Sequence, residues 1–131
     1  MSINNPYQTY KENTVTTASP GDLTLMLYNG CLKFIKQGRQ AILDKNIEEK
    51  NTSSLKVQEI IRELMATLNM EYEISHQMML MYDYILNRLI EANVNNNLEA
   101  LDEASSHIKE FRDTWQQVIR LNRKMQYGQG L

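Results

Sequence analysis

The sequence has 131 residues, which is enough for one domain with a hydrophobic core and too short for two domains of ordinary size. Hydrophobic residues make up 42%, charged residues make up 23%, and the formal net charge is −2. This balance is typical of a soluble globular protein and argues against an electrostatic grip on nucleic acid or an anionic membrane.

The sequence contains no stretch near the roughly 20 consecutive apolar residues of a membrane span, so we expect no membrane insertion. A basic region followed by an apolar core is also missing from the N-terminus, so we expect no cleaved signal peptide. Cys31 is the only cysteine and cannot form an internal disulfide, which favours a reducing compartment. We therefore expect the protein in the cytoplasm.

Residues 1–18 are polar and rich in turn formers, with neither helical nor strand periodicity. They predict an irregular N-terminal arm. Tyr7 and Tyr10, together with Ile3, are spaced to lie along one side of a docked segment. A docked arm and a disordered tail are both open on this evidence.

The first predicted helix spans about residues 20–43. Ser19 is a good N-cap, Pro20 suits the first turn, and Asp22 places a carboxylate at the positive end of the helix dipole. Its apolar residues cover roughly 200° of the helix in two strips, about twice the width that a surface helix needs. The second strip consists of Leu25, Tyr28, Leu32 and Leu43. Either this helix is central, or the second strip awaits a partner.

The second and third predicted helices differ from each other in the amount of apolar surface that they carry. Asn46 with Glu49 resembles a capping box and predicts a helix over about 47–69 with a single apolar strip. The third helix, over about 75–93, has more apolar surface than one strip. Its main strip consists of Met78, Met81, Tyr82, Ile85 and Leu89. Its additional apolar residues are Met79, Leu80, Tyr84, Leu86 and Ile90.

The fourth helix is predicted over about 97–125, after a second capping-box pattern of Asn96 and Glu99. Its apolar residues, which include Phe111 and Trp115, fall in one narrow arc, and we assign these two to the core. Four helices with short connections predict an all-α, antiparallel four-helix bundle over residues 19–125, followed by a flexible tail over 126–131.

The sequence offers no set of catalytic or metal-binding residues. A di-metal bundle site needs two Glu-x-x-His motifs, whereas Glu73 and His76 form one and His107 follows Glu103 at a spacing of four. Cys31 lies among apolar residues with no histidine nearby in sequence, which favours a structural thiol. No glycine-rich phosphate loop is present. We expect no enzyme activity, no cofactor and no metal.

Two function classes account for the surplus apolar surface. One is a binding module that holds an apolar helical peptide in a groove. The other is a helical homo-oligomeric structural or adaptor protein, such as a homodimer, that buries the surplus against another copy. A movable arm with aromatic residues suits the first class better, because it can cover a groove when no partner is bound.

The residues themselves resemble a known family. Tyr7, Tyr10, the segments 15–23 (VTTASPGDL) and 27–31 (LYNGC), and the later segment 81–84 (MYDY) closely resemble the flagellar secretion chaperone FliS. Later segments of the chain also match the family pattern, at Glu63-Leu64, Leu89–Asn93 and Phe111-Arg112. The resemblance therefore spans about residues 4–120.

The resemblance implies a cytosolic export chaperone that binds the C-terminal segment of flagellin and prevents premature polymerisation before flagellar type III export. It also implies that the N-terminal arm helps to cover the hydrophobic site when no client is bound. The flagellar export gate is a further candidate partner. We predict that the client surface or the arm includes Tyr7, Tyr10, Leu25, Tyr28, Leu32, Met79, Leu80, Tyr84, Leu86 and Ile90.

Overall fold

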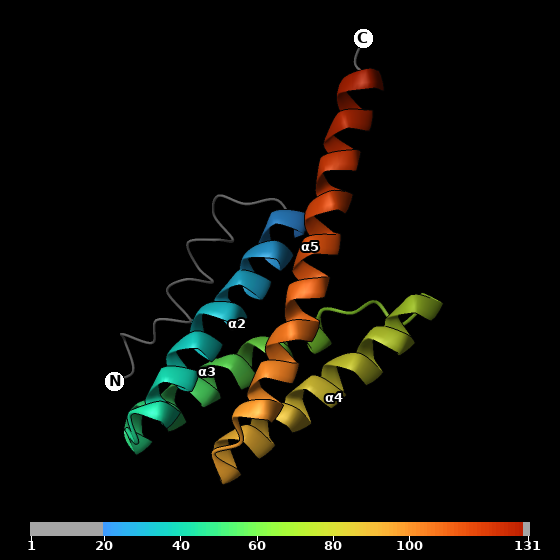
Figure 1. Ribbon diagram of the computed structural model, residues 1–131. Coiled ribbons are helices and arrows are strands. Elements are labelled where there is room, and N and C mark those ends of the chain that lie inside the picture. The colour runs from blue at the N-terminus through green and yellow to red at the C-terminus, as the bar shows by residue number, and fades with distance from the viewer. Residues whose placement is uncertain (1–19, 130–131) are drawn as a thin grey trace, which may run out of the picture.

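The computed structural model describes residues 20–129, which fold into helices joined by short connections (Figure 1). The helices are α2 (Pro20–Leu43), α3 (Ile47–Ala66), α4 (Glu73–Asn95) and α5 (Leu98–Gln129). Residues 20–129 contain no strand. The prediction of an all-α helical bundle is confirmed. The predicted arm and the proposed Ser19 cap lie outside the described residues.

Successive helices run in opposite directions and pack side by side. α2 packs against α3 and α5, and α4 packs against the same two helices (Figure 1). α5 therefore closes the bundle by returning to α2. Figure 1 also shows that α4 and α5 lie close together at the turn that joins them and diverge toward the N-terminal end of α4.

The helix ends follow local side-chain chemistry. The Asn46 side chain accepts a hydrogen bond from the Glu49 amide at 3.1 Å, so the predicted cap of α3 is present. The cap of α5 is one residue later than predicted, because Asn97 accepts from the Ala100 amide while Asn96 ends α4 in the left-handed conformation. Asparagine tolerates that conformation better than most residues.

Three other helix ends differ from expectation. α3 ends at Ala66 and α4 begins at Glu73, so the connection between them lies about two residues earlier in the chain than the pattern predicted. α5 continues to Gln129, beyond the expected end near Met125. Neither a proline nor a glycine marks the ends at Ala66 and Glu73, whereas Gly130 directly follows Gln129 in the sequence.

All of the helices contribute to one hydrophobic core. Its largest fully buried members are Val57, Ile60 and Ile61 from α3, Ile85 and Leu89 from α4, Ile108 from α5, and Cys31 from α2. Burial raises the pKa of the Cys31 thiol well above its ordinary value, because the thiolate would lose its hydration. The thiol therefore stays protonated and packs as a small apolar group.

Burial along α5 decreases toward its C-terminus. Ile108 is fully buried, Trp115 is half-buried, and Leu121 and Met125 are each 60% exposed. α5 has 32 residues and α2 has 24, which correspond to about 48 Å and about 36 Å of helix. The C-terminal part of α5 thus projects beyond the other helices (Figure 1).

Candidate functional site

A groove of about 600 Å³ lies between α5 and the diverging end of α4. The end of α3, the connection 67–72 and the first half of α2 complete it. The groove is lined by Thr24, Tyr28, Leu64, Thr67, Leu68, Asn69, Tyr72, Ile74, Ser75, Met78, Tyr82, Glu110, Phe111, Thr114, Trp115 and Val118. Most of these side chains are apolar or aromatic, and Glu110 is the one charged residue among them.

The connection between α3 and α4 contributes one side of the groove. The Thr67 hydroxyl donates to the Leu64 carbonyl, and the Asn69 side chain accepts from the Glu71 amide. These bonds fix the connection against the end of α3. α4 starts away from α5 (Figure 1), and the side chains of Tyr72 and Ile74, which line the groove, are mostly exposed.

Three aromatic rings from different helices form the floor of the groove. The hydroxyl oxygens of Tyr28 on α2 and Tyr82 on α4 lie 2.6 Å apart. The ring of Phe111 on α5 stacks beside Tyr28 and meets Tyr82 edge-on, with centroids 6.1 Å and 5.8 Å away. Desolvation raises the pKa of both tyrosines, so both phenols stay neutral at physiological pH.

Trp115 forms the wall of the groove on α5 and is held in place by a hydrogen bond. Its indole Nε1 donates to the carbonyl of Gly21 in the first turn of α2, at 2.8 Å. Further along α5, Arg123 contacts the Asp22 carboxylate at 3.0 Å. These two contacts therefore hold the first turn of α2 against α5 beside the groove.

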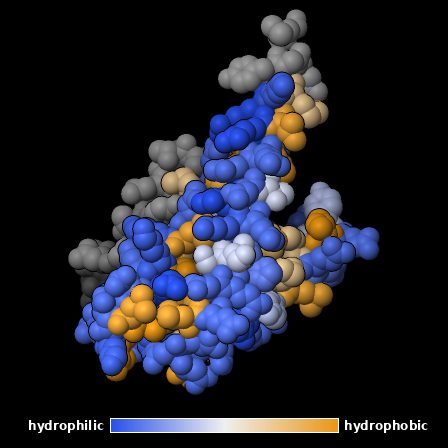
Figure 2. Space-filling model, viewed as in Figure 1, coloured by the Kyte–Doolittle hydropathy of each residue, from blue (hydrophilic) through white to orange (hydrophobic). Residues whose placement is uncertain are grey.

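The groove continues as an apolar strip on the projecting part of α5. Val118, Leu121 and Met125 follow Trp115 at helical spacing and lie on one side of the helix. Figure 2 shows hydrophobic surface on this part of α5 and, beside it, over the N-terminal half of α4. An open apolar surface of this kind, with a groove at one end, is typical of a site that takes an amphipathic helix.

The structure places the site residues predicted from the sequence on several surfaces. Tyr7 and Tyr10 lie outside the described residues. Of the others, Tyr28 lines the groove, where it is 3% exposed and forms part of the floor. Leu32 and Leu86 pack against the core, Leu25 and Met79 are half-buried, and Leu80, Tyr84 and Ile90 are exposed.

The additional apolar residues of α4 do not form one surface. At about 100° per residue, Met79, Leu86 and Ile90 lie on one flank of the helix, while Tyr84 lies on the flank that faces α5. There the Tyr84 hydroxyl donates to the Glu103 carboxylate, which also pairs with Arg88 at 2.9 Å. The hydrogen bond from Tyr84 lowers the pKa of Glu103. A client role for these residues stays a prediction.

Sequence reasoning missed most of the groove. It assigned Phe111 and Trp115 to the core, and both do pack against the core, but each also lines the groove. Their apolar arc was correctly recognised. The length of the fourth predicted helix could have indicated which part of its apolar arc is covered. α5 is longer than α2, so the other helices cannot cover its whole apolar arc.

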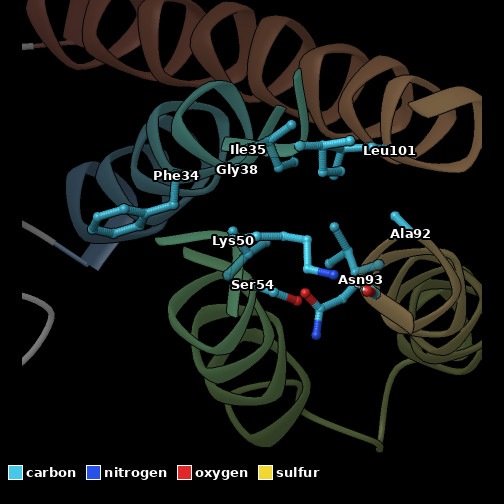
Figure 3. Close-up of a pocket in the computed structure, with 11 residues that line it drawn as sticks. Phe34, Ile35, Gly38, Lys50, Ser54, Ala92, Asn93 and Leu101 are labelled. Atoms are coloured by element: carbon cyan, nitrogen blue, oxygen red, sulfur yellow. Dashed lines mark hydrogen bonds between the residues drawn. The ribbon is translucent and has the colours of Figure 1, made fainter. Parts of the chain in front are cut away.

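A second, much smaller hollow lies at the other end of the bundle. Its volume of about 20 Å³ has room for about one water molecule. Figure 3 shows Lys50 reaching from α3 toward Asn93 of α4, where its ammonium group donates to the Asn93 carbonyl at 2.8 Å. This hollow is a packing feature and too small for a ligand.

The described residues offer little for metal chemistry. Within residues 20–129, no three histidine, cysteine, aspartate or glutamate side chains are grouped so that they could hold a metal ion. The ring of His76 is within hydrogen-bond distance of the Met70 carbonyl, and Cys31 is enclosed in the core. No helix in this range is long and apolar enough to cross a bilayer.

Comparison with known proteins identifies the family. A family model described as "Flagellar protein FliS" matches residues 3–122. The chain belongs to the FliS family. The flagellar secretion chaperone FliS of Bacillus subtilis is 49% identical over 130 residues, which are 99% of this chain and 98% of that protein. The FliS of Vibrio cholerae is 31% identical, over 85% of this chain and 86% of that protein.

A solved structure agrees with the fold. The crystal structure of a flagellar chaperone from bacteria superimposes with a TM-score of 0.72 at 17% identity, and covers 88% of this chain and 95% of that one. The resemblance found in the sequence is thus confirmed, and the protein is a flagellar secretion chaperone by family. The family is named for chaperones and not for an enzyme activity.

The tyrosine pair in the groove floor predicts an unusual mutational pattern. Tyr28→Phe or Tyr82→Phe alone leaves the other hydroxyl buried without a partner, so each should lower the free energy of unfolding by about 1–3 kcal/mol. The double variant removes both polar groups and should stay within about 1 kcal/mol of the unmodified chain. Urea denaturation followed by circular dichroism measures this cycle, and additive losses would contradict it.

Proposed function

We propose that the protein binds the C-terminal segment of flagellin in the groove and along the apolar strip of α5. A segment that is disordered when free uses part of its interaction energy for ordering, so its chaperone must offer a large apolar surface. The observation that carries the proposal is the continuity of the groove, which Val118 lines, with the exposed side chains of Leu121 and Met125 further along α5.

In this proposal the client segment folds into a helix whose apolar face lies in the groove. Trp115 and Phe111 offer aromatic surface at the centre of such an interface, where large aromatic side chains contribute most to affinity. Enclosing the apolar face of flagellin in this way keeps it from pairing with other flagellin subunits. The client thus stays unpolymerised in the cytoplasm until the flagellar type III apparatus exports it.

The N-terminal arm completes the proposal. We infer that residues 1–18 act as a separate arm whose Tyr7 and Tyr10 cover apolar surface when no client is present, as the resemblance implies. A segment of the same chain competes with the client through its high effective concentration, so the arm would set an upper limit on affinity. The export gate is a further partner in this scheme.

Trp115 allows the proposal to be tested directly, because it is the only tryptophan in the chain and lines the groove. Titration of the full chain with a tryptophan-free peptide from the flagellin C-terminus should shift the Trp115 fluorescence and saturate at one peptide per chain. Flagellin incubated with the chain should also polymerise more slowly in light scattering. An unchanged spectrum together with no binding by calorimetry would contradict the proposal, and concentration-dependent dimers in chromatography would favour the homo-oligomer instead.

A further inference from the structure

The hydroxyls of Tyr28 and Tyr82 in the groove floor carry two protons, and the hydrogen bond between them uses only one. Each phenolic hydroxyl carries one proton and accepts through its oxygen. The single contact of 2.6 Å between Tyr28 and Tyr82 places one of the two protons between the oxygens. The other proton belongs to the accepting hydroxyl and must point elsewhere.

No acceptor for this second proton is found in residues 20–129. Within this range, the bond between the two hydroxyls is the only hydrogen bond that either of them forms. The neighbouring groups are the ring of Phe111, which offers no oxygen or nitrogen, and the Cys31 thiol, whose sulfur is only a weak acceptor and forms no hydrogen bond with either hydroxyl. Because desolvation raises the pKa of both phenols, neither loses its proton at physiological pH. Among residues 20–129 the pair is therefore a donor without an acceptor, and both tyrosines line the apolar groove.

We propose that the Tyr28–Tyr82 pair donates its free hydroxyl proton to an uncharged oxygen of the bound flagellin segment. This inference rests on the proposed function and names a chemical requirement on the client. The oxygen belongs either to an asparagine, glutamine, serine or threonine side chain or to a backbone carbonyl at the end of a client helix. A carboxylate is disfavoured, because the groove lining contains Glu110 and no lysine, arginine or histidine to compensate a buried negative charge.

The consequence for recognition is a fixed register. An apolar helix in an apolar groove can shift by a turn at small cost, since one aliphatic side chain replaces another. A single buried donor removes this freedom, because every register but one leaves the donor unpaired. Such a polar contact among apolar ones is known to fix register in coiled coils. The tyrosine pair would thus select where on its own sequence flagellin is held.

The test compares the full unmodified chain with the variant that carries Tyr28→Phe and Tyr82→Phe together, using a flagellin C-terminal peptide and calorimetry. The double variant keeps the shape of the floor and removes both hydroxyls, so the fold should survive. We expect its affinity for the peptide to fall about tenfold, as for the loss of one buried hydrogen bond. Equal or tighter binding by the double variant would overturn the inference.

Peptide substitutions then identify the acceptor. Each asparagine, glutamine, serine and threonine of the peptide is replaced in turn by alanine. A side-chain acceptor gives one substitution that weakens binding to the unmodified chain and has no effect on the double variant. If no substitution behaves in this way while the double variant still binds about tenfold more weakly, the acceptor is a backbone carbonyl. If the unmodified chain does not bind the peptide at all, the proposed function fails and this inference falls with it.

Discussion

The Val118→Asp variant should bind the flagellin C-terminal peptide about a hundredfold more weakly than the unmodified chain, or not at all. Val118 lies on the wall of the groove at the point where the apolar strip of α5 begins. A bound helix would bury the new carboxylate, and the described lining offers no cation to pair with it.

A matched control separates this effect from a general effect of added charge. Val94→Asp makes the same change on α4, at a side chain that is 68% exposed and lies outside the groove. Its peptide affinity should change less than twofold, since surface substitutions away from an interface are close to neutral. Both variants should retain the helical circular dichroism spectrum. Equal weakening by the two variants, or wild-type affinity in Val118→Asp, would show that the client does not use the groove.

Ile85→Ala should cost about 2–5 kcal/mol of the free energy of unfolding, the range measured for large-to-alanine changes in closed cores. Ile85 is 0% exposed on the inner face of α4, so alanine leaves a cavity that its neighbours fill only in part. This side of α4 also carries Tyr82, so the core behind Ile85 supports the floor of the groove. Guanidinium denaturation followed by circular dichroism measures the loss.

The same helix supplies the control. Ile90 is 37% exposed and belongs to the surplus apolar residues that the sequence singled out. Ile90→Ala makes the identical chemical change and should cost clearly less than Ile85→Ala, because Ile90 is partly exposed and its truncation leaves no closed cavity. A loss as large as that of Ile85→Ala would mean that Ile90 completes a closed core, which would remove it from the candidates for client contact.

The fold could be predicted well because its signals are local. Pro20 and Asp22 begin a helix, Asn46 caps the next one, and 3.6-residue periodicity runs through every helix that the structure describes. The helix ends at Ala66 and Glu73, which were predicted less well, have no such local signal. The cap at Asn97 was missed by one residue, since three consecutive asparagines offer equivalent side chains at this turn.

The candidate site could be predicted only in part, because it depends on how far the helices overlap. Sequence reasoning looked for apolar surface beyond one strip and so selected residues of the first and third predicted helices. The groove instead includes the continuation of the single, regular strip of α5, from Phe111 to Val118. An arc of apolar residues has the same pattern in a covered part of a helix and in an uncovered part.

The sequence by itself determined the helical class, the near-complete extent of α2 and the membership of a chaperone family, since each of these depends on residue types at short or fixed spacing. Only the tertiary structure decided which apolar residues are enclosed and which line a groove. The physical reason is that an apolar side chain is buried only where another helix covers it. Ile108 lies in the core that all of the helices form, whereas Met125 lies further along α5, beyond the other helices, and is exposed. The pairing of Tyr28 with Tyr82, 54 residues apart, is likewise set by the packing of α2 and α4 against a common core.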